Sequence, residues 1–455
     1  MTPRVLHYSD IEGAYDDPDR IGRLAGRIDE LRGEDTLVVG TGDNTAPGVL
    51  AMVAEGEQAL DFFRAVSPDA GTFGNHDFDF GHERTRELVR GSPQTWVCAN
   101  VYDSEGRFGA ADGVLPWIAL ETETHRVGVF GVIDPDTPSM TTVPDGFEFT
   151  DPVVAAEEAV SELRDRGVDY VVALSHVGSG DDEIAAAVDI DAILGGHAHS
   201  ERIERANDTL FTRPGANGRV LLEITLGDPA SATRHEVAEA PLDTAVRDAL
   251  EARMERKGLN EVVAHVEDRI EWTGKSVYDG ECRIGNFVAD AYRWASDADV
   301  GLQNSGGIRA GRALDGDVTA GHLASVVPFD APVVVASVTG EELHEAFRQG
   351  DSGLVAFGDD SRWYAHVSGA RVTYDHAERA LVEATVGGEP IDPERTYTVA
   401  TPAFVLSTDM EFPVLTPDHR RRTLDVQYEV LAAYAREKGI YPEINGRITR
   451  LGAPR

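Results

Sequence analysis

Short apolar runs alternate with amphipathic segments through the first half of the chain. Runs of four to eight apolar residues, bounded by polar or glycine-containing turns, are typical of buried β-strands. The predicted strands are RVLHYSD (4–10), DTLVVGTGD (35–43), AGTFGNHD (70–77), TWVCAN (95–100), RVGVFGVID (126–134), DYVVALSHVG (169–178) and DAILGGHAH (191–199). Helical periodicity is found at 16–32, 54–66 and 152–166. This alternation predicts an α/β domain with helices packed on its sheets.

The pattern changes in the second half of the chain. Two runs, TLFTRPGAN (209–217) and VLLEITLGD (220–228), predict a hairpin that closes the first domain, and a polar helical period over 240–258 predicts a connecting helix. A helical segment over 280–295 and the glycine-rich turn after DVGLQN (299–304) then begin a smaller α/β domain. The predicted division is 1–239, 240–258 and 259–455.

Net charge limits what the protein can bind. The chain of 455 residues has 80 Asp and Glu against 41 Lys and Arg, a formal charge of −39, and the acids are spread along its whole length. Such a composition is typical of proteins adapted to molar salt, where repulsion is screened over a few Å. No broad basic face is expected, so nucleic acid is not an expected partner.

Cysteines and apolar runs indicate the compartment. Cys98 and Cys282 are far apart and have no CxxC partner, which disfavours a disulfide framework or a cysteine metal site. The N-terminus runs into the first strand without an apolar leader, and no apolar run reaches ~18 residues. We therefore expect a cytoplasmic protein that does not associate with membranes.

Side chains that can ligate metal ions follow the predicted strands of the first half. Asp10 and Glu12 are two residues apart, so on an extended chain they point to the same side. Ligands of open α/β sheets bind beyond the carboxyl ends of the strands, so residues from several strands can meet there. In so acidic a chain, a solvated surface pair is the alternative for Asp10 and Glu12. The candidate ligands are Asp10, Glu12, Asp43, Asn75, His176, His197 and His199, with His76, Asp77 and Asp79 beside Asn75.

The ordered motifs D-x-E, GDN, GNHDFD, SH and GGHAH resemble those of the calcineurin-like metallophosphoesterases. The nearest resemblance is to the 5′-nucleotidase and UDP-sugar hydrolase family, because ECRIGN, NSGGIR, VPF and TPAF resemble motifs of its C-terminal nucleotide-binding domain. The resemblance implies a four-layer α/β/β/α sandwich followed by a smaller α/β domain.

A two-metal centre follows from this resemblance. Asp43 would bridge two divalent ions, and His76, oriented by Asp79, would stabilise charge on the phosphoryl group, whereas Asp77 is interpreted as a turn carboxylate. Glu12 departs from the family, which usually has histidine there; its harder oxygen shifts the expected Mn²⁺ or Zn²⁺ towards Mn²⁺ or Mg²⁺. The implied ligands are Asp10, Glu12 and His199 for one ion, and Asn75, His176 and His197 for the other.

The resemblance also implies a nucleotide site in the second domain. Phe329 and Phe404 match the two rings that hold the base, and Asp409 would bind ribose. The match at Asp409 is poor, because STDMEF replaces the family's glycine-rich turn. The remaining implied substrate residues are Arg283, Asn304, Gly307 and Arg309.

Three functional hypotheses follow. The first is hydrolysis of nucleoside 5′-monophosphates by attack of a metal-bound hydroxide, and the second is hydrolysis of UDP-sugars or 2′,3′-cyclic nucleotides on the same scaffold. The third is a nucleotide-binding module without catalysis, which Glu12 and STDMEF favour but the intact His76 and Asp79 pair disfavours. The sequence specifies neither the nucleobase nor the oligomeric state.

Overall fold

The computed structural model describes residues 2–141, 146–206, 208–351 and 361–453. The chain forms two compact units, Met1–Lys257 and Gly258–Arg455, and each is described by itself. Within the described ranges, no helix is both long enough and apolar enough to cross a bilayer.

Two six-stranded sheets form the centre of the first unit. The first has the order β15-β14-β1-β2-β3-β4, with Ser231–Glu236, Val220–Thr225, Arg4–Tyr8, Thr36–Thr41, Ala70–Thr72 and Thr95–Trp96. The second has the order β12-β13-β11-β10-β8-β7, with Arg202–Ala206, Thr209–Arg213, Ala192–Gly195, Tyr170–His176, Arg126–Ile133 and Trp117–Glu121. A small third sheet contains β6 (Gly106–Arg107), β5 (Val101–Asp103) and β9 (Glu148–Phe149). The neighbours β1, β2 and β3 are parallel, as are β8, β10 and β11, so their carboxyl ends lie at common edges.

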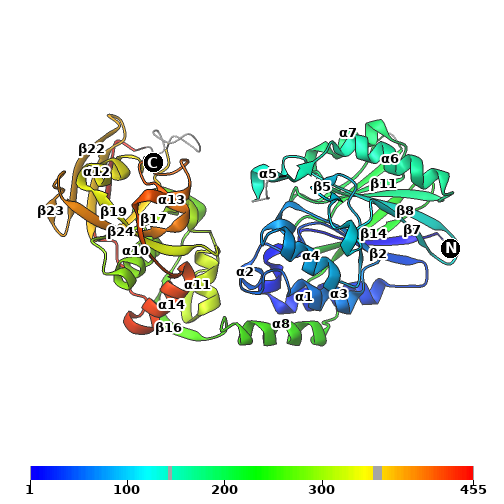
Figure 1. Cartoon of the computed structure of the whole chain (residues 1–455). Coiled ribbons are helices and arrows are strands. Elements are labelled where there is room, and N and C mark those ends of the chain that lie inside the picture. The colour runs from blue at the N-terminus through cyan, green and yellow to red at the C-terminus, as the bar shows by residue number, and fades with distance from the viewer. Residues whose placement is uncertain (1, 142–145, 207, 352–360, 454–455) are drawn as a thin grey trace. The chain divides into compact units, whose positions relative to one another are not determined.

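The two sheets pack face to face between two layers of helices (Figure 1). Valines and leucines from both sheets, such as Val39 and Leu174, fill the core between them. On the outer face of the second sheet lie α6 (Pro152–Asp165) and α7 (Asp181–Ala187). On the other side are α1 (Pro18–Leu31), α2 (Val49–Ala54), α3 (Ala59–Val66), α4 (His82–Gly91) and α8 (Thr244–Arg256). This arrangement confirms the predicted four-layer sandwich.

The predicted hairpin of 209–217 and 220–228 is wrong. β13 joins the second sheet beside β11 and β12, whereas β14 joins the first sheet between β1 and β15. Both strands are almost entirely buried, so their apolar pattern does not indicate which neighbour each will pair with.

The helical period at 54–66 also differs from the structure. The chain forms α2 and α3 with a break between them, because Glu55 and Gly56 adopt left-handed backbone with φ of 50° and 79°. By contrast, 152–166 corresponds closely to α6, which begins at Pro152 after the N-cap Asp151. Segment 240–258 contains α8, which packs on α1 and α3 of the first unit.

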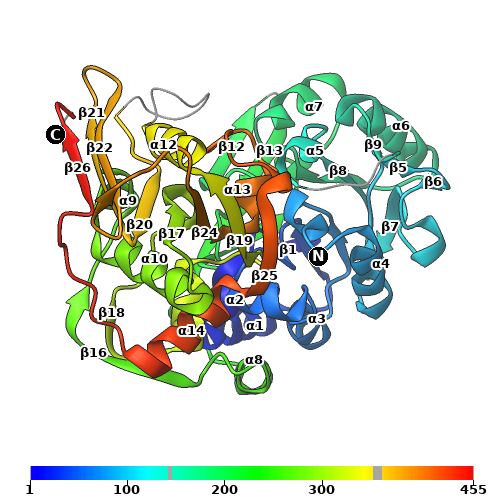
Figure 2. The ribbon, with the colours of Figure 1, turned by 60° about the vertical axis from the view of Figure 1, so that its left-hand side comes forward.

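The second unit is built on a five-stranded sheet (Figure 2). Its order is β20-β17-β24-β19-β25, with Ala365–Ser368, Val300–Asn304, Thr396–Pro402, Pro332–Thr339 and Arg420–Val426. Helices α10 (Arg283–Ser296) and α14 (Gln427–Lys438) pack together on one face. On the other face lie α12 (Gly340–Arg348) and the sheet of β23 (Glu389–Pro390), β22 (Ala380–Val386), β21 (Ala370–Asp375) and β26 (Ile448–Leu451). The shorter elements are β16 (Val262–Ile270), which pairs with β18 (Leu314–Thr319), and the helices α9 (Gly274–Tyr278), α11 (Ala320–Val326) and α13 (Ala403–Ser407).

The charge of −39 predicts a fold that requires salt. Repulsion between surface carboxylates is screened over ~3 Å at 1 M salt and over ~30 Å at 0.01 M, so the folded state gains stability as KCl is added. We expect the thermal unfolding midpoint to rise continuously from millimolar to molar KCl. A midpoint that stays flat across that range, followed by circular dichroism, would contradict the prediction.

Candidate metal centre

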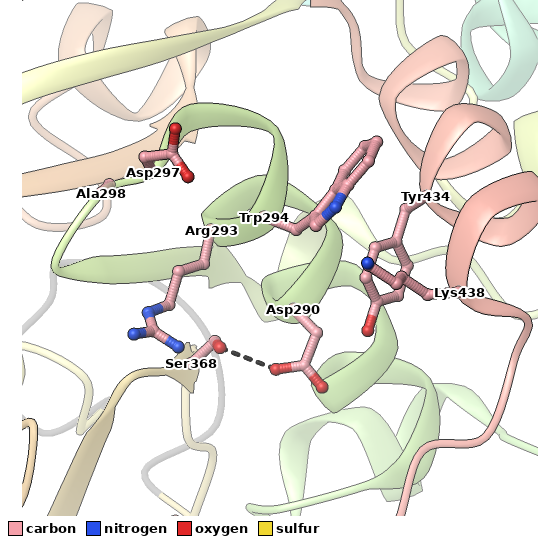
Figure 3. A pocket seen from close by; sticks show the side chains of 8 residues that line it. All are labelled: Asp290, Arg293, Trp294, Asp297, Ala298, Ser368, Tyr434 and Lys438. Carbon is pink, nitrogen blue, oxygen red and sulfur yellow. Dashed lines mark hydrogen bonds between the residues drawn. The ribbon is translucent and has the colours of Figure 1, made fainter.

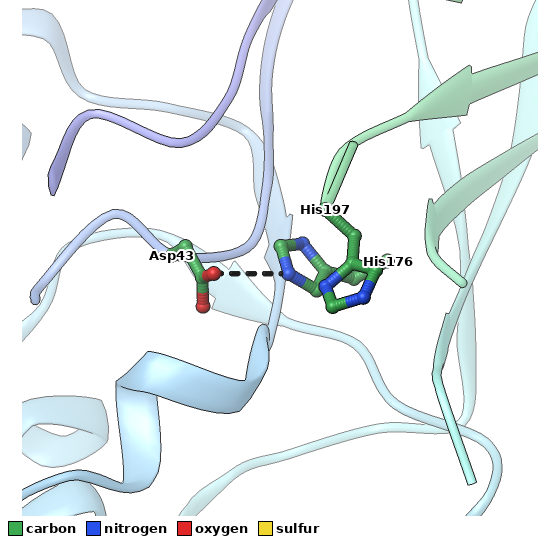
Figure 4. Close-up of side chains that lie close together, drawn as sticks. All are labelled: Asp43, His176 and His197. Atoms are coloured by element: carbon green, nitrogen blue, oxygen red, sulfur yellow. Dashed lines mark ion pairs between the residues drawn. The ribbon is translucent and has the colours of Figure 1, made fainter. Parts of the chain in front are cut away.

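The first group of candidate metal ligands lies where the two sheets meet at their carboxyl ends. Asp43 follows β2, His176 is the last residue of β10, and His197 follows β11. One ligand atom from each lies within 4.8 Å of the others (Figure 4). His176 Nε2 is 3.1 Å from Asp43 Oδ2, and His197 Nδ1 is 3.0 Å from Asn75 Oδ1. Asn75 therefore adjoins this group, as the resemblance implies.

A second group contains Asp10, Glu12 and His199, again with ligand atoms within 4.8 Å of one another. His199 Nε2 lies 2.8 Å from Glu12 Oε1 and 3.9 Å from Asp10 Oδ1. Glu12 is only 7% exposed, which removes the alternative that it is a solvated surface group. The structure thus brings all seven predicted ligands into two neighbouring sets, while the bridging role of Asp43 remains a prediction.

Four of the candidate ligands have left-handed backbone conformations. Asp10 and Glu12 both have φ of 47°, Asp43 has φ of 51° and His197 has φ of 68°. Non-glycine residues rarely adopt positive φ, and such strain is retained where the surrounding structure enforces it, often at functional sites. Close packing contributes, because a Cβ added at Gly74 would lie 2.2 Å from Asp43 Oδ1. The backbone is therefore shaped to bring these side chains together.

The hydrogen bonds of His176 test whether the first group fits a cation. Its Nδ1 lies 2.7 Å from the carbonyl oxygen of Thr41, so Nδ1–H donates to that oxygen. Burial opposes protonation of the ring, but the Asp43 carboxylate raises the pKa of His176 to about 10, so without a metal ion a proton lies between Nε2 and Asp43. A metal ion can take the place of this proton, with Nε2 and the carboxylate both facing it, while Nδ1–H stays bound to the carbonyl oxygen. The donor set fits a divalent ion.

Buried carboxylates give the second group the same requirement. Burial, aided by the neighbouring Asp43 carboxylate, raises the pKa of Asp10 to about 6 and that of Glu12 to about 7, although nearby histidines oppose the shift. Removing carboxylates from water is costly unless a cation compensates them. The electrostatics of both groups therefore favour bound cations.

Asp77 does more than the turn role predicted for it. Its Oδ2 accepts hydrogen bonds from the backbone N–H groups of Asp43 and Gly74, and its Oδ1 accepts from Thr45 N and Oγ1. This buried carboxylate ties the loop that carries Asp43 to the turn that carries Asn75. It is a positioning residue that the sequence analysis did not identify as one.

His76 lies next to Asn75 and is more open to solvent. Its Nδ1 is 2.8 Å from Asp79 Oδ2, as the predicted orienting role requires, and its side chain is 33% exposed. Burial opposes protonation, but the hydrogen bond to Asp79 and the charges of Asp43, Asp79 and Glu12 raise the pKa of His76 to about 9. Thr141 Oγ1 donates to Asp79 Oδ1 at 3.0 Å and was not predicted.

In the second unit, a cavity of about 370 Å³ gathers most of the predicted substrate residues. Phe329 and Phe404 both line it, and Phe404 is 49% exposed. The guanidinium of Arg309 lies 5.0 Å from the centre of the Phe329 ring. Asn304, Gly306 and Gly307 also line the cavity.

Two predicted substrate residues do not line this cavity. The Arg283 guanidinium donates to the backbone carbonyl oxygens of Pro442, Arg269 and Asp268, so it braces the chain around α10. Asp409 is exposed outside the cavity. The structure therefore does not bring Arg283 or Asp409 to this cavity, and substrate contact by either residue stays a prediction.

Glu411, two residues after Asp409, is the acidic residue that lines the cavity. It is 3% exposed, lines the cavity and accepts a hydrogen bond from Asn304 Nδ2. Burial raises the pKa of Glu411 to about 7, although Asn304 and Arg309 oppose the shift. The sequence signal that could have identified Glu411 is its position two residues after Asp409, in the same altered turn STDMEF.

Comparisons with known proteins agree with both units. The calcineurin-like phosphoesterase family matches residues 3–201, and the 5′-nucleotidase C-terminal domain family matches residues 262–417. The chain belongs to the 5′-nucleotidase family. This assignment confirms, at the level of the family, the predicted phosphoric ester hydrolase with divalent metal ions.

Individual relatives of the 5′-nucleotidase family are distant. The trifunctional nucleotide phosphoesterase YfkN of Bacillus subtilis is 26% identical over 99% of this chain, but this chain spans only 35% of its length. An apyrase of Tabanus yao is 26% identical over 95% of this chain and 90% of its own. The crystal structure of a 5′-nucleotidase precursor from Thermus thermophilus superposes with a TM-score of 0.70 and 24% identity, covering 100% of both chains, which shows a common fold.

Proposed function

We propose that this protein removes the phosphate group from nucleoside 5′-monophosphates. The observation that carries the proposal is the convergence of two ligand groups with the His76–Asp79 pair at one edge of the first unit's sheets. A binding module would need neither the pair nor the strained, buried carboxylates beside it.

The chain's own residues supply binding and orientation. Divalent ions bound here would neutralise the phosphate and activate water. Asp10, Glu12 and His199 would hold one ion, and Asn75, His176 and His197 would hold the other. Asp43 would be shared between them. The His76 Nδ1–H donates to Asp79, which turns Nε2 of the ring outward to donate to a phosphoryl oxygen. This hydrogen bond becomes stronger as negative charge develops on the phosphoryl oxygen in the transition state.

The cavity of the second unit supports a nucleotide as the substrate. Phe329 and Phe404 offer flat faces that stack on any base, and Glu411 can accept hydrogen bonds from ribose hydroxyls. Stacking on these rings does not distinguish the hydrogen-bonding groups of one base from those of another, so we expect the protein to accept different nucleobases.

Hydrolysis of a substrate panel in molar KCl tests the proposal, with the products separated by chromatography because cleavage of UDP-glucose or of a cyclic nucleotide leaves the phosphate attached to a product. The panel contains AMP, UMP, UDP-glucose and 2′,3′-cyclic AMP, each with Mn²⁺, Zn²⁺ or Mg²⁺ added to metal-free protein. We expect the highest kcat/KM with the monophosphates. Faster cleavage of UDP-glucose or the cyclic nucleotide would favour the second hypothesis, and nucleotide binding without cleavage of any substrate in the panel would favour the binding module.

Thr141→Val removes the hydroxyl that holds Asp79 without changing the size of the side chain much. One such hydrogen bond contributes ~1 kcal/mol, so kcat should fall about five-fold while metal content and KM stay unchanged. Thr124→Val, at an exposed threonine on the turn before β8, is the matched control. An unchanged kcat would show that Asp79 is held adequately by His76 alone.

Phe404→Ala tests the nucleobase site. Stacking contributes ~1–3 kcal/mol per base, so KM for AMP should rise at least five-fold, with a smaller change in kcat. Tyr441→Ala removes a 73% exposed ring of the same unit that does not line the cavity, and should leave KM unchanged. Equal KM values for the two variants would remove Phe404 from the substrate site.

A further inference from the structure

A buried glutamine on the wall of the second unit's cavity has no role in the function proposed above. Gln427 is the first residue of α14, is 2% exposed and lines the cavity together with Phe329. Its backbone N–H donates to the carbonyl oxygen of Ala331 at 3.3 Å, so Gln427 lies against the segment that follows Phe329. Its side chain is therefore close to one of the two rings assigned to the nucleobase.

A single hydrogen bond determines which way the amide of Gln427 points. The hydroxyl of Tyr292 lies 2.7 Å from Gln427 Oε1, and the Tyr292 side chain is completely buried. Among the described residues, that oxygen is the one acceptor that the hydroxyl has. If the amide were turned over, the hydroxyl would have to accept from Nε2, and its own proton would stay unpaired in the core. The amide oxygen therefore faces Tyr292, and the NH₂ group faces the other way.

The position of Tyr292 on α10 explains why its hydroxyl depends on Gln427. The outer face of α10 carries Asp290, Arg293 and Trp294, which border an open hollow (Figure 3). There the Asp290 carboxylate accepts a hydrogen bond from Ser368. Tyr292 is turned away from this face and belongs to the core that α10 shares with α14. Its hydroxyl is thus remote from solvent, and the start of α14 supplies its acceptor.

The NH₂ group of Gln427 has no hydrogen-bond partner in the part of the chain that the structure describes. Nε2 nevertheless differs from the unpaired side-chain atoms that are fully buried, such as Gln58 Oε1 and Gln303 Oε1, because it is not one of them. Nε2 therefore retains access to open space, and the space that Gln427 lines is the cavity. An unpaired donor on a cavity wall is a group that a ligand can satisfy.

The other polar wall of the cavity has the opposite hydrogen-bonding character. Glu411, which follows α13, offers carboxylate oxygens and is held by Asn304 at the end of β17. These oxygens suit the ribose hydroxyls, as proposed above. A base that lies between the two phenylalanine rings with its ribose at Glu411 has its far edge, remote from the glycosidic bond, free to meet the donor of Gln427.

We propose that Gln427 ranks the nucleobases, by donating a hydrogen bond from Nε2 to the carbonyl oxygen at position 6 of a purine or position 4 of a pyrimidine. This inference rests on the proposed function and adds the order of preference among its substrates. Hypoxanthine, guanine and uracil have that oxygen, whereas adenine and cytosine carry an amino group there. An amino group is itself a donor, so it leaves the Gln427 amide unpaired. All of these bases stack on the rings, so Gln427 ranks the substrates and excludes none.

Hydrolysis of inosine 5′-monophosphate (IMP) and AMP, whose bases differ in the group at position 6 and in the proton on N1, tests the proposal. We expect kcat/KM to be about five-fold higher with IMP, because one hydrogen bond is made only with that base. Gln427→Met keeps the length of the side chain, removes the amide and should abolish the preference. Gln427→Glu replaces the donor with acceptor oxygens and should favour AMP. Equal kcat/KM values for wild type, or an unchanged preference in Gln427→Met, would overturn the proposal.

Tyr292→Phe tests the orientation of the amide while Gln427 stays in place. Without the hydroxyl the amide can turn over, so the preference for IMP should decrease while circular dichroism shows a folded protein. Tyr434→Phe removes a half-buried hydroxyl of α14 that does not line the cavity, and should retain the preference. A full preference for IMP in a folded Tyr292→Phe variant would contradict the orientation on which the proposal depends.

Binding measurements separate this inference from the proposed function. The methylenephosphonate analogues of IMP and AMP cannot be hydrolysed, and calorimetric titration of the metal-loaded full chain in molar KCl gives a Kd for each. We expect wild type to bind the IMP analogue more tightly and Gln427→Met to bind both equally. If no monophosphate is hydrolysed but this difference in Kd is found, the proposed function fails and the role of Gln427 stands. Equal Kd values for wild type would overturn the role of Gln427, whether or not AMP is hydrolysed.

Discussion

Replacing His76 with asparagine should lower kcat for AMP by ~10²–10³ while both metal ions remain bound. The loss of one preorganised donor to a charge that develops in the transition state typically has this effect. Metal content should persist, because His76 belongs to neither ligand group and contacts Asp43 only through its backbone N–H, which asparagine keeps. Turnover in molar KCl and metal analysis by mass spectrometry are the measurements.

A neighbouring histidine provides the matched control. His82 begins α4 and pairs with the exposed Glu83, so His82→Asn should leave turnover unchanged. If His76→Asn loses its metal ions, the residue supports the ligand groups and its role in the transition state is wrong. A loss of less than about three-fold would show that the phosphoryl group is stabilised elsewhere.

The candidate site was predictable from the sequence because its residues are tied to the strand ends. Asp10, Asp43 and His176 each end a strand or follow it closely, and parallel neighbours bring such positions together whatever the details of packing. Local motifs therefore sufficed to identify the ligands. The supporting contacts were not predictable, since Asp77 and Thr141 act through partners 34 and 62 residues away.

The wrong hairpin and the unexpected positions of residues in the second unit both depend on contacts between distant parts of the chain. The pairing of β13 and β14 depends on which sheet offers an open edge, and two buried strands with a short connection look like a hairpin until that is known. Arg283 is suitable for binding phosphate, yet its guanidinium is used by three backbone carbonyl groups that come from other parts of the unit. Glu411 shows the converse, because its burial and its contact with Asn304 exist only in the folded chain.

The strongest test of the metal centre concerns Glu12, at the position where the family resemblance implies a histidine. Glu12→Ala removes one buried oxygen 2.8 Å from His199 Nε2 and leaves Asp43, His176 and His197 untouched. Metal content should fall from about two ions towards one per chain, and turnover should be largely lost, since a two-ion site needs both members. Glu34→Ala, at an exposed glutamate, should keep both ions and full turnover.

Glu12→His separates ligation from mere charge balance. The alternative to metal binding is an ion pair between Glu12 and His199, which lie 2.8 Å apart. In that case the second ion is unnecessary. If Glu12 binds metal, histidine at this position should restore two ions and move the preference from Mn²⁺ towards Zn²⁺, because nitrogen ligands suit Zn²⁺ better. If Glu12 only balances His199, Glu12→His places two imidazoles together without an acid and should give neither the second ion nor the shift in metal preference. Metal stoichiometry and metal-dependent turnover, measured for wild type, Glu12→Ala and Glu12→His in the same molar KCl buffer, distinguish the two outcomes.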